Sequence, residues 1–472
     1  MTKKSIIWFR QDLRLNDNPA LTAACKSDNI IPVFILDDTN PKEFELGSAK
    51  KVWLHHSLQS FNSSLSDSLS IFKGDPISIL TELIEEFGVD SVFWNRCYQP
   101  WQIKRDKEIK NSLSEKNINC DSFNGSLLWE PWKVLKNDGT PFKVFTPFWR
   151  TAEQIYLNQP PSKNYIVKKK TKAINFFKNS IDLKNILPNK KWYEKFDKYW
   201  KVSENDSQKI LKDLLENKIK DYGTNRDIPS INGTSRLSPY LKFGQIHVNT
   251  IWKKCSELKS KGIGYRKYIN ELGWREFSHS LINYFPEFLK GNFRKEFDKF
   301  PWAKNEKFLK AWKKGMTGYP IVDAGMRELY ETGWMHNRIR MVVGSFLVKH
   351  LRINWIEGEK HFRNCLLDFN KANNVAQWQW VAGCGADAAP YFRIFNPILQ
   401  GEKFDKEGIY VKKWVPELNK VPAKFIHKPW EMEIKYQEAI KTIIGKDYPQ
   451  PIVIHEKARA AALDAFQSLK KK

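Results

Sequence analysis

The sequence predicts an N-terminal α/β domain with a Rossmann-like parallel sheet, followed by an all-α domain. Residues 5–125 alternate short apolar runs with helix-length amphipathic stretches, a rhythm typical of a parallel sheet covered by helices. After about residue 203, almost every segment has the helical period of apolar residues. These two patterns change within one chain of 472 residues, which is long enough for more than one domain.

Four apolar runs are the strand candidates of the first region: "SIIWF", "IIPVFIL", "LSIFKG" and "DSVFWN". Residues 48–65 and 76–87 are the clearest helix candidates between them. The first strand is followed by "WFRQDLRLNDNPAL" and not by G-x-G-x-x-G, so the dinucleotide fingerprint is missing where a Rossmann fold would carry it.

Prolines and a basic stretch, "VKKKTKAINFFKNS", interrupt the pattern between about residues 131 and 201. We interpret this segment as a long connection that wraps the surface. The predicted organisation is an α/β domain at 1–130, an inter-domain linker at 131–200 and an all-helical domain at 201–472. The clearest amphipathic segment of the last domain is "ELYETGWMHNRIRMVVGSFLVKHL".

Composition narrows the possible functions. Lys plus Arg number 78 against 53 Asp plus Glu, a net charge of +25 that favours a nucleic-acid partner, although a Lys- and Asn-rich genome bias is the competing explanation. No apolar run reaches the ~18 residues of a membrane span, so we expect a cytoplasmic protein. The six cysteines form no C-x-x-C pair and the nine histidines no H-x-x-x-H, so neither a disulfide framework nor a metal site is expected.

Spacing suggests a site in the helical half. Glu271 and Trp274 share one helix face, as do Asn337 and Met341, and each pair joins a polar group to a large apolar one. Such pairs suit a cavity that stacks on a flat ligand and hydrogen-bonds its edge, whereas an ordinary glutamate and an ordinary core aromatic are the alternative. The "GCGADA" stretch matches G-x-G-x-x-A, but it follows a Trp-rich helical segment, so it is not interpreted as a nucleotide fingerprint.

Charged residues in the helical half also suggest a ligand site. An Arg-dense helix with Arg338 and Arg340 is followed by "LLDFNKANN", so a guanidinium can pair with Asp368 beside a cofactor. The alternative is an Arg–Asp ion pair that only stabilises the fold. "GTSRLSPYLKFG" offers hydroxyls, an arginine and backbone amides before a helix, which suits a pyrophosphate or serves as a plain helix cap.

In combination these motifs resemble the photolyase/cryptochrome family, and within it the bacterial cyclobutane pyrimidine dimer photolyases. The resemblance is carried in order by "WFRQDLRLNDNPAL", "GTSRLSPYLKFG", "NELGWREF", "TGYPIVDAGMRELYETGWMHNRIRM", "WQWVAGCGADAAPYFRIFNPILQGEKFD" and "YPQPIV". It implies that the helical domain binds FAD and that blue light drives repair of UV-damaged DNA by lending one electron to a flipped-out dimer and taking it back.

The resemblance also assigns roles to residues. Those implied to bind FAD are Tyr222, Thr234, Ser235, Arg236, Leu237, Ser238, Arg340, Asp368, Asn370 and Asn374. Those implied to contact the lesion are Glu271, Trp274, Asn337, Met341 and Trp380, and those implied to contact the DNA strand are Arg226, Arg338, Arg393 and Gln400. An electron-transfer chain that reduces oxidised flavin is implied for Trp378, Trp355 and Trp302. On a helix, Trp378 and Trp380 face nearly opposite sides, which fits their separate roles.

Two positions suggest the substrate. Relatives that repair (6-4) photoproducts have histidines at the positions of Asn337 and Met341, so the cyclobutane dimer is the expected lesion. Asn374 matches photolyases, whereas plant cryptochromes have Asp there. The alternative is a light-sensing cryptochrome with little duplex repair, including the DASH type that prefers single strands. We expect Asn374 and the absence of a long tail after "YPQPIV" to favour the repair enzyme.

Three positions differ from the residues found in relatives, and one of them bears on a second chromophore. Asn370 stands where relatives often have a second Asp, and Tyr268 where a relative has Trp near the flavin. Gln102, in "WNRCYQPWQIKRD", stands where some relatives bind a pterin through Glu, and the surrounding pattern favours methenyltetrahydrofolate as an antenna chromophore, with a deazaflavin possible. The protein is expected to be a monomer that associates with the nucleoid when bound to DNA.

Overall fold

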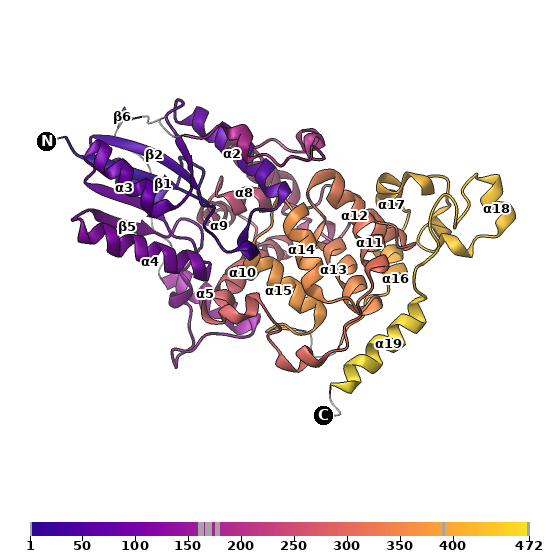
Figure 1. The fold of residues 1–472 in the computed structure, drawn as a ribbon. Helices are drawn as coiled ribbons and strands as arrows, with labels where there is room; N and C mark the ends of the chain where they lie inside the picture. Colours follow the sequence, from indigo (N-terminus) through magenta and orange to yellow (C-terminus); the bar gives the residue numbers. More distant parts are fainter. Residues whose placement is uncertain (1, 159–164, 166–171, 175–179, 389–391, 470–472) are drawn as a thin grey trace.

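The computed structural model describes residues 2–158, 165, 172–174, 180–388 and 392–469. A sheet with its helices forms one end of the molecule, α17 and α18 lie at the other, and α10 and α15 lie between them (Figure 1). The predicted α/β domain followed by a helical domain is therefore confirmed.

The described strands form one sheet in the order β3-β2-β1-β4-β5, with β6 pairing with β2, and every pairing is parallel. Their bounds are β1 Lys4–Phe9, β2 Asn29–Leu36, β3 Ser70–Lys73, β4 Ser91–Asn95, β5 Asn119–Phe123 and β6 Lys172–Ala173. The four apolar runs coincide with β1 to β4. The polar sequence of β5, NCDSF, gave no such signal because this strand lies at the sheet edge and is only partly buried.

Helices cover the sheet as the alternation of patterns predicts. They are α1 Pro19–Ala24, α2 Ser48–Ser64, α3 Pro76–Phe87 and α4 Pro100–Glu115. Helix α3 shows why these residues are helical: the Asp75 side chain accepts a hydrogen bond from Ser78 N–H at its start, and Gly88 ends it with φ of +60°. Its buried face, with Leu80, Leu83 and Ile84, packs into the apolar core under β1 and β4.

The segment between the two domains contributes structure of its own. It contains η2 Pro131–Lys133, α5 Phe145–Asn158, η3 Leu183–Ile186 and η4 Glu194–Lys198, besides β6. Helix α5 packs against α10 of the helical domain. Residues 166–171 and 175–179, which make up most of "VKKKTKAINFFKNS", lie outside the described residues.

The helical domain is built around α10, the longest of its described helices. The helices are α6 Glu204–Asp213, α7 Tyr222–Asn225, α8 Ser238–Phe243, α9 Val248–Ser256, α10 Ile263–Tyr284, α11 Glu306–Lys314, α12 Pro320–Thr332, α13 Asn337–Ser345, α14 Trp355–Cys365, α15 Lys371–Ala382, α16 Pro397–Phe404, α17 Ile409–Trp414, α18 Ile434–Ala439 and α19 His455–Ser468. Two π-helical turns, Leu214–Lys218 and Phe346–His350, continue α6 and α13. None of the described helices is long and apolar enough to cross a membrane.

The amphipathic segment 328–351 is not one helix. Helix α12 ends at Thr332 because Gly333 adopts φ of +68°, a left-handed conformation that ends helices. Helix α13 then begins at Asn337, where the His336 ring accepts a hydrogen bond from Arg338 N–H. The break gives α13, with Arg338, Arg340 and Met341, a direction of its own.

The two domains share one apolar core, and polar contacts lock their junction. Trp53 Nε1 on α2 donates to Gln245 Oε1 at 2.9 Å, and Arg14 Nη1 donates to Gly244 O at 2.9 Å. Leu13 N–H donates to Phe243 O at 3.1 Å. These contacts all hold the end of α8, so the loop that precedes α8 is fixed relative to both domains.

Candidate active site in the helical domain

The candidate site lies where four helices meet the loop before α8. Helix α10 packs against α7 and α15, and α13 packs against α15. The residues expected to contact the lesion lie on α10, α13 and α15, and those expected to bind flavin lie on α7, the loop before α8, α13, α15 and the short segment that leads into α15.

The loop 234–238 is held in one conformation from both ends. Gly233 is pressed against the backbone of Asn225, where any side chain would collide. Arg236 has φ of +55°, and its guanidinium lies 4.8 Å from the Trp334 ring centre. Burial lowers the pKa of Arg236, and the nearby Glu328 carboxylate opposes that shift. The hydroxyls of this loop are therefore presented by a rigid turn.

Asp368 joins this loop to α13. Ser238 Oγ donates to Asp368 Oδ2 at 2.7 Å, and Arg340 Nη2 donates to the same oxygen at 2.8 Å. Arg340 is itself fixed because its Nε donates to Met335 O at 2.8 Å. The other carboxylate oxygen, Asp368 Oδ1, is buried and has no hydrogen-bond partner among the described residues. A buried acceptor without a partner is costly unless a ligand supplies a donor.

Helix α15 contributes two asparagines. Asn370 caps it, since its Oδ1 accepts from Asn373 N–H at 3.3 Å. Asn374 follows one turn later, and its Nδ2 is buried without a partner in the described part of the chain. A free donor on Asn374 and a free acceptor on Asp368 are what the mixed donor and acceptor edge of a flavin ring requires. These residues fit FAD.

Glu271, at the centre of α10, lies at the middle of a hydrogen-bonded cluster. Tyr222 donates its hydroxyl to Glu271 Oε2 at 2.7 Å, and Arg226 Nε lies 3.0 Å from Oε1. Burial raises the pKa of Glu271, and the Arg226 charge works against the rise. Tyr222 in turn meets the Tyr268 ring edge-on at 5.2 Å, and the Tyr268 hydroxyl is buried without a partner among described residues.

Asp227 links the arginines expected to contact DNA. Its carboxylate lies 2.8 Å from Arg338 Nη2 and 4.0 Å from Arg226 Nε. Arg338 also lies over the Phe404 ring of α16 at 4.5 Å, so its position is set from both sides. Asp227 was not among the residues predicted from the sequence, although it directly follows Arg226.

The other residues expected to contact DNA lie in and just before α16. Gln400 is half-buried on α16, and Arg393 is exposed in the segment that leads to it. Residues 389–391, which precede this segment and belong to the "GCGADAAPYFRIF" motif, lie outside the described residues.

The residues expected to contact the lesion are accessible to different degrees. Trp274 is half-buried, and its ring is stacked on Phe145 of α5 at 3.9 Å with an interplanar angle of 9°. Phe145, from the inter-domain segment, was not predicted as part of the site. Met341 and Trp380 are half-buried, and Asn337 is exposed at the first turn of α13.

The three tryptophans expected to carry electrons differ in environment. Trp378 is 4% exposed and packs against Phe362 and Trp312, with ring centres at 5.1 and 6.2 Å. Trp355 is buried and donates from Nε1 to Asn292 Oδ1 at 2.8 Å. Trp302 is partly exposed beside Phe300, at 4.4 Å between ring centres. Trp378 and Trp355 are both buried, at 4% and 1% exposure, and only Trp302 reaches the surface.

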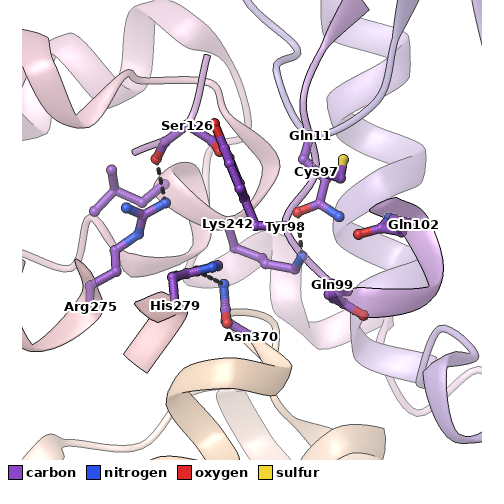
Figure 2. Close-up of a pocket in the computed structure, with 11 residues that line it drawn as sticks. Gln11, Cys97, Tyr98, Gln99, Gln102, Ser126, Lys242, Arg275, His279 and Asn370 are labelled. Atoms are coloured by element: carbon purple, nitrogen blue, oxygen red, sulfur yellow. Dashed lines mark hydrogen bonds between the residues drawn. The ribbon is translucent and has the colours of Figure 1, made fainter. Parts of the chain in front are cut away.

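A small pocket lies between the two domains, one side formed by the α/β domain and the other by α8, α10 and the cap of α15 (Figure 2). Its lining residues are Gln11, Cys97, Tyr98, Gln99, Gln102, Ser126, Leu241, Lys242, Arg275, His279 and Asn370. Gln102, expected near an antenna chromophore, is among them. Within the described ranges, no group of three or more His, Cys, Asp or Glu residues is arranged to hold a metal ion.

Comparison with known proteins agrees with this geometry. Residues 5–165 match the family model for DNA photolyase, and residues 268–468 match the model for the FAD binding domain of DNA photolyase. The deoxyribodipyrimidine photo-lyase of Agrobacterium fabrum is 44% identical over 480 residues, covering 100% of this chain and 99% of that protein. Cryptochrome-2 of Arabidopsis thaliana is 35% identical, covering 97% of this chain and 78% of that protein.

A solved structure extends the similarity to three dimensions. The crystal structure of a bacterial class III photolyase from Agrobacterium tumefaciens superposes with a TM-score of 0.94 at 44% identity, covering 100% of this chain and 98% of that one. Sequence motifs, domain models, full-length relatives and fold all agree. The chain belongs to the photolyase/cryptochrome family and is an enzyme of its deoxyribodipyrimidine photo-lyase type.

Proposed function

We propose that the protein splits cyclobutane pyrimidine dimers in UV-damaged DNA with FAD as its cofactor. The observation that carries this proposal is the Glu271 carboxyl group, which Tyr222 and Arg226 hold in place one helical turn before Trp274. A fixed hydrogen-bonding group beside an aromatic ring suits a flipped-out pyrimidine pair, whose edges are polar and whose faces are flat.

FAD is held by the loop 234–238, Asp368, Arg340 and the asparagines of α15. When bound in its reduced form and excited by blue light, it supplies one electron that returns after bond cleavage, so the reaction has no net redox change. Asp368 Oδ1 would accept a hydrogen bond from the ring edge, and Arg340 orients the carboxylate through Oδ2. Asn374 would offer the ring an amide donor that cannot release a proton, which would favour the anionic reduced form.

Glu271 holds the pyrimidine edges. Tyr222 and Arg226 fix its carboxyl group at the site, so its oxygens are positioned to hydrogen-bond the polar edge of a flipped-out pyrimidine. Trp274 and Trp380 stack on the bases and Met341 fills the remaining apolar space. Arg226, Arg338, Arg393 and Gln400 bind the strand, and the net charge of +25 favours association of the whole protein with DNA.

The lesion is assigned from the first turns of α13. Neither Asn337 nor Met341 has a side chain that can transfer a proton, and repair of a (6-4) photoproduct needs such a transfer. The adjacent His336 does not replace them: it is buried, its Nδ1 accepts from Arg338 N–H, and burial lowers its pKa to about 4. The cyclobutane dimer needs no proton transfer, so it is the substrate that these residues suit.

The test is repair of duplex DNA with defined dimers by the FAD-loaded, reduced enzyme in blue light and in the dark. We expect the absorbance of intact pyrimidines to return only in the light, with no repair of (6-4) photoproducts. The variant E271Q should lower the yield and keep FAD bound, whereas E257Q, at the exposed Glu257, should change neither. A wild-type enzyme that leaves the dimers intact in light would refute the proposal.

The same assay decides the alternative of a light-sensing cryptochrome. The similarity to cryptochrome-2 of Arabidopsis thaliana is the observation that favours testing it. A cryptochrome would reduce its flavin in light and leave dimers in duplex DNA intact. A DASH-type protein would repair them in single strands alone, so both substrates belong in the assay.

A second, light-harvesting chromophore would bind on the side of the α/β domain where Gln102 lies in the lining of the pocket in Figure 2, with methenyltetrahydrofolate favoured over a deazaflavin. At the carboxyl end of β1, a usual ligand position in such sheets, Arg10 forms a buried ion pair at 2.7 Å with Asp106 of α4. The absorption spectrum of the chromophore released from purified protein identifies it. The protein acts as a cytoplasmic monomer that associates with the nucleoid.

A further inference from the structure

One side of α10 carries two of the residues proposed to contact the lesion and continues beyond them toward the start of the helix. Residues spaced three or four apart share a side of a helix, and four residues of α10 are spaced in this way: Ile263, Lys267, Glu271 and Trp274. Lys267 and Ile263 are exposed, Ile263 at 77%, and the function proposed above gives neither of them a role.

Two neighbouring helices flank this side of α10 without covering it. On one flank, Tyr222 of α7 meets Tyr268 edge-on at 5.2 Å. On the other flank lies α5 (Figure 1), where Trp149 Nε1 donates to Asn270 Oδ1 at 3.0 Å. With 3.6 residues in each turn, Lys267 points between the directions of Tyr268 and Asn270. It therefore stays exposed between α5 and α7.

The start of α10 and the loop before it are strongly basic. Six Lys or Arg residues and one Glu stand between residues 253 and 267. Two of the six form ion pairs, one with Glu257 and one with Glu153. Three others are exposed and form no ion pair with another described residue: Lys259, Lys261 and Lys267. Exposed cations without partners are suited to the phosphates of a nucleic acid.

The loop before α10 is fixed against the segment that leads to Arg226. A side chain at Gly264 would collide with Ile219 O, and one at Gly223 would lie 3.1 Å from Ile263 Cγ2. Arg226 follows three residues after Gly223 and is proposed above to bind the DNA strand. The exposed lysines therefore lie next to a segment that already belongs to the proposed DNA-binding surface.

We propose that the damaged strand leaves the site along α10, and that Lys267 and Lys261 bind its phosphates. This inference rests on the repair function proposed above. With a rise of 1.5 Å per residue, Lys267 lies about 6 Å along the helix from Glu271, and the start of α10 lies about 12 Å from it. Base pairs are stacked about 3.4 Å apart, so these contacts fall about two and four base pairs from the dimer.

The test is the binding of the FAD-loaded protein to duplex DNA with one defined dimer, measured by fluorescence anisotropy over a range of salt concentrations. Each phosphate contact contributes about 0.9 to the slope of log Kd against log salt concentration. In the double variant K261A/K267A, the slope should therefore fall by about 1.8. The affinity at 0.1 M salt should fall about 60-fold, and the difference should disappear near 1 M salt.

The chain offers a control with the same loss of charge. Lys3 and Lys26 are exposed before β1 and β2, at the end of the molecule that carries the N-terminus (Figure 1). Charges farther from the DNA than about 10 Å are screened at 0.1 M salt, so K3A/K26A should bind nearly as wild type does. The variant K261R/K267R keeps both charges on α10 and should also bind like wild type.

Shortened duplexes test where the contacts fall. One duplex ends one base pair beyond the dimer on its 5′ side, and a second ends one base pair beyond it on its 3′ side. A strand that follows α10 in one direction reaches the lysines from one side of the dimer alone. One shortened duplex should therefore bind wild type and K261A/K267A equally, and the other should keep the difference between them.

Four results would overturn the inference: an unchanged salt slope in K261A/K267A, an equal change in K3A/K26A, binding by K261R/K267R as weak as that of the alanine variant, or a difference that survives both shortenings. The proposed function is judged separately, because lysines that only bind phosphates should leave the repair yield of reduced enzyme at saturating DNA unchanged. Absence of repair by wild type, with the binding differences intact, would refute the function alone.

Discussion

Glycine at position 358 is required by the way Trp378 is packed, and its replacement by alanine gives the sharpest prediction. A methyl carbon at Gly358 on α14 would lie 2.5 Å from Trp378 Cζ2 and 2.7 Å from Cζ3. Carbon atoms pack at about 3.5–4.0 Å, so the overlap is about 1 Å against a ring that is already enclosed by Phe362 and Trp312. Overpacking of this kind costs typically 1–3 kcal/mol, and the ring or α14 must move.

The chain offers a matched control for this change. Gly344 on α13 faces the same ring from another side, but a methyl carbon there would lie 3.5 Å from Trp378 Cζ3, an ordinary contact. G344A should therefore be neutral or should stabilise by about 0.5–1 kcal/mol, since alanine favours a helix. Both variants keep Trp378, so only its position differs between them.

Thermal unfolding and photoreduction are the assays. G358A should lower the unfolding midpoint and slow the light-driven reduction of oxidised flavin, while repair by chemically reduced enzyme should change little. G344A should resemble wild type in all three measurements. Equal behaviour of G358A and G344A would show that Trp378 is not held as the structure indicates, and a loss of repair equal to the loss of photoreduction would show that its role is not confined to supplying electrons.

Three further predictions follow from the sites. W302F should abolish photoreduction but spare repair by reduced enzyme, because Trp302 is the exposed end of the proposed path; equal loss of both in a light-driven assay would contradict this. D368N removes the charge on the oxygen to which Ser238 and Arg340 both donate. Hydrogen bonds to charged groups contribute about 1.5–3 kcal/mol, so titration with FAD should show binding weakened about 10- to 150-fold. An unchanged affinity would place the flavin elsewhere. Burial lowers the pKa of Lys242 from 10.5 to about 8, so between these pH values the folded state binds fewer protons than the unfolded state. Burying the charged Lys242 therefore destabilises the fold fully below pH 8, and this destabilisation disappears as the pH rises to 10.5. The stability advantage of K242M over wild type, followed by unfolding midpoints against pH, should therefore shrink across that window, and a constant difference would refute the shift.

Local sequence patterns were sufficient to predict those strands and helices whose limits are set by their own residues. The strands β1 to β4 are apolar along their length because both faces of a parallel sheet are covered, so they can be recognised without knowledge of their partners. The limits of α3 follow from Asp75 and Gly88, which lie beside it in sequence. The assignment of Trp378 and Trp380 to opposite sides of α15 likewise needs only the helix period, and one is buried and the other partly exposed.

The edge strand β5 shows where these patterns fail. Its sequence NCDSF is polar, and it is a strand because β4 supplies a parallel partner from Ser91 to Asn95. In the amphipathic segment 328–351 the pattern predicts too much regular structure. Its apolar period continues, but Gly333 adopts a left-handed conformation and ends α12. The β5 pairing and the Gly333 conformation are settled by neighbours outside the local window.

The sequence by itself determined the order of the two folds and the family, because apolar periodicity and long motifs are properties of consecutive residues. Only the tertiary structure decided how the sites are built. Asp227 between two arginines, Phe145 stacked on Trp274, Gly358 against Trp378 and His279 against Asn370 are all contacts between residues that lie on different elements or enter from other segments. Each depends on where the chain has folded, and a sequence pattern carries no record of the distance between residues that are far apart along it.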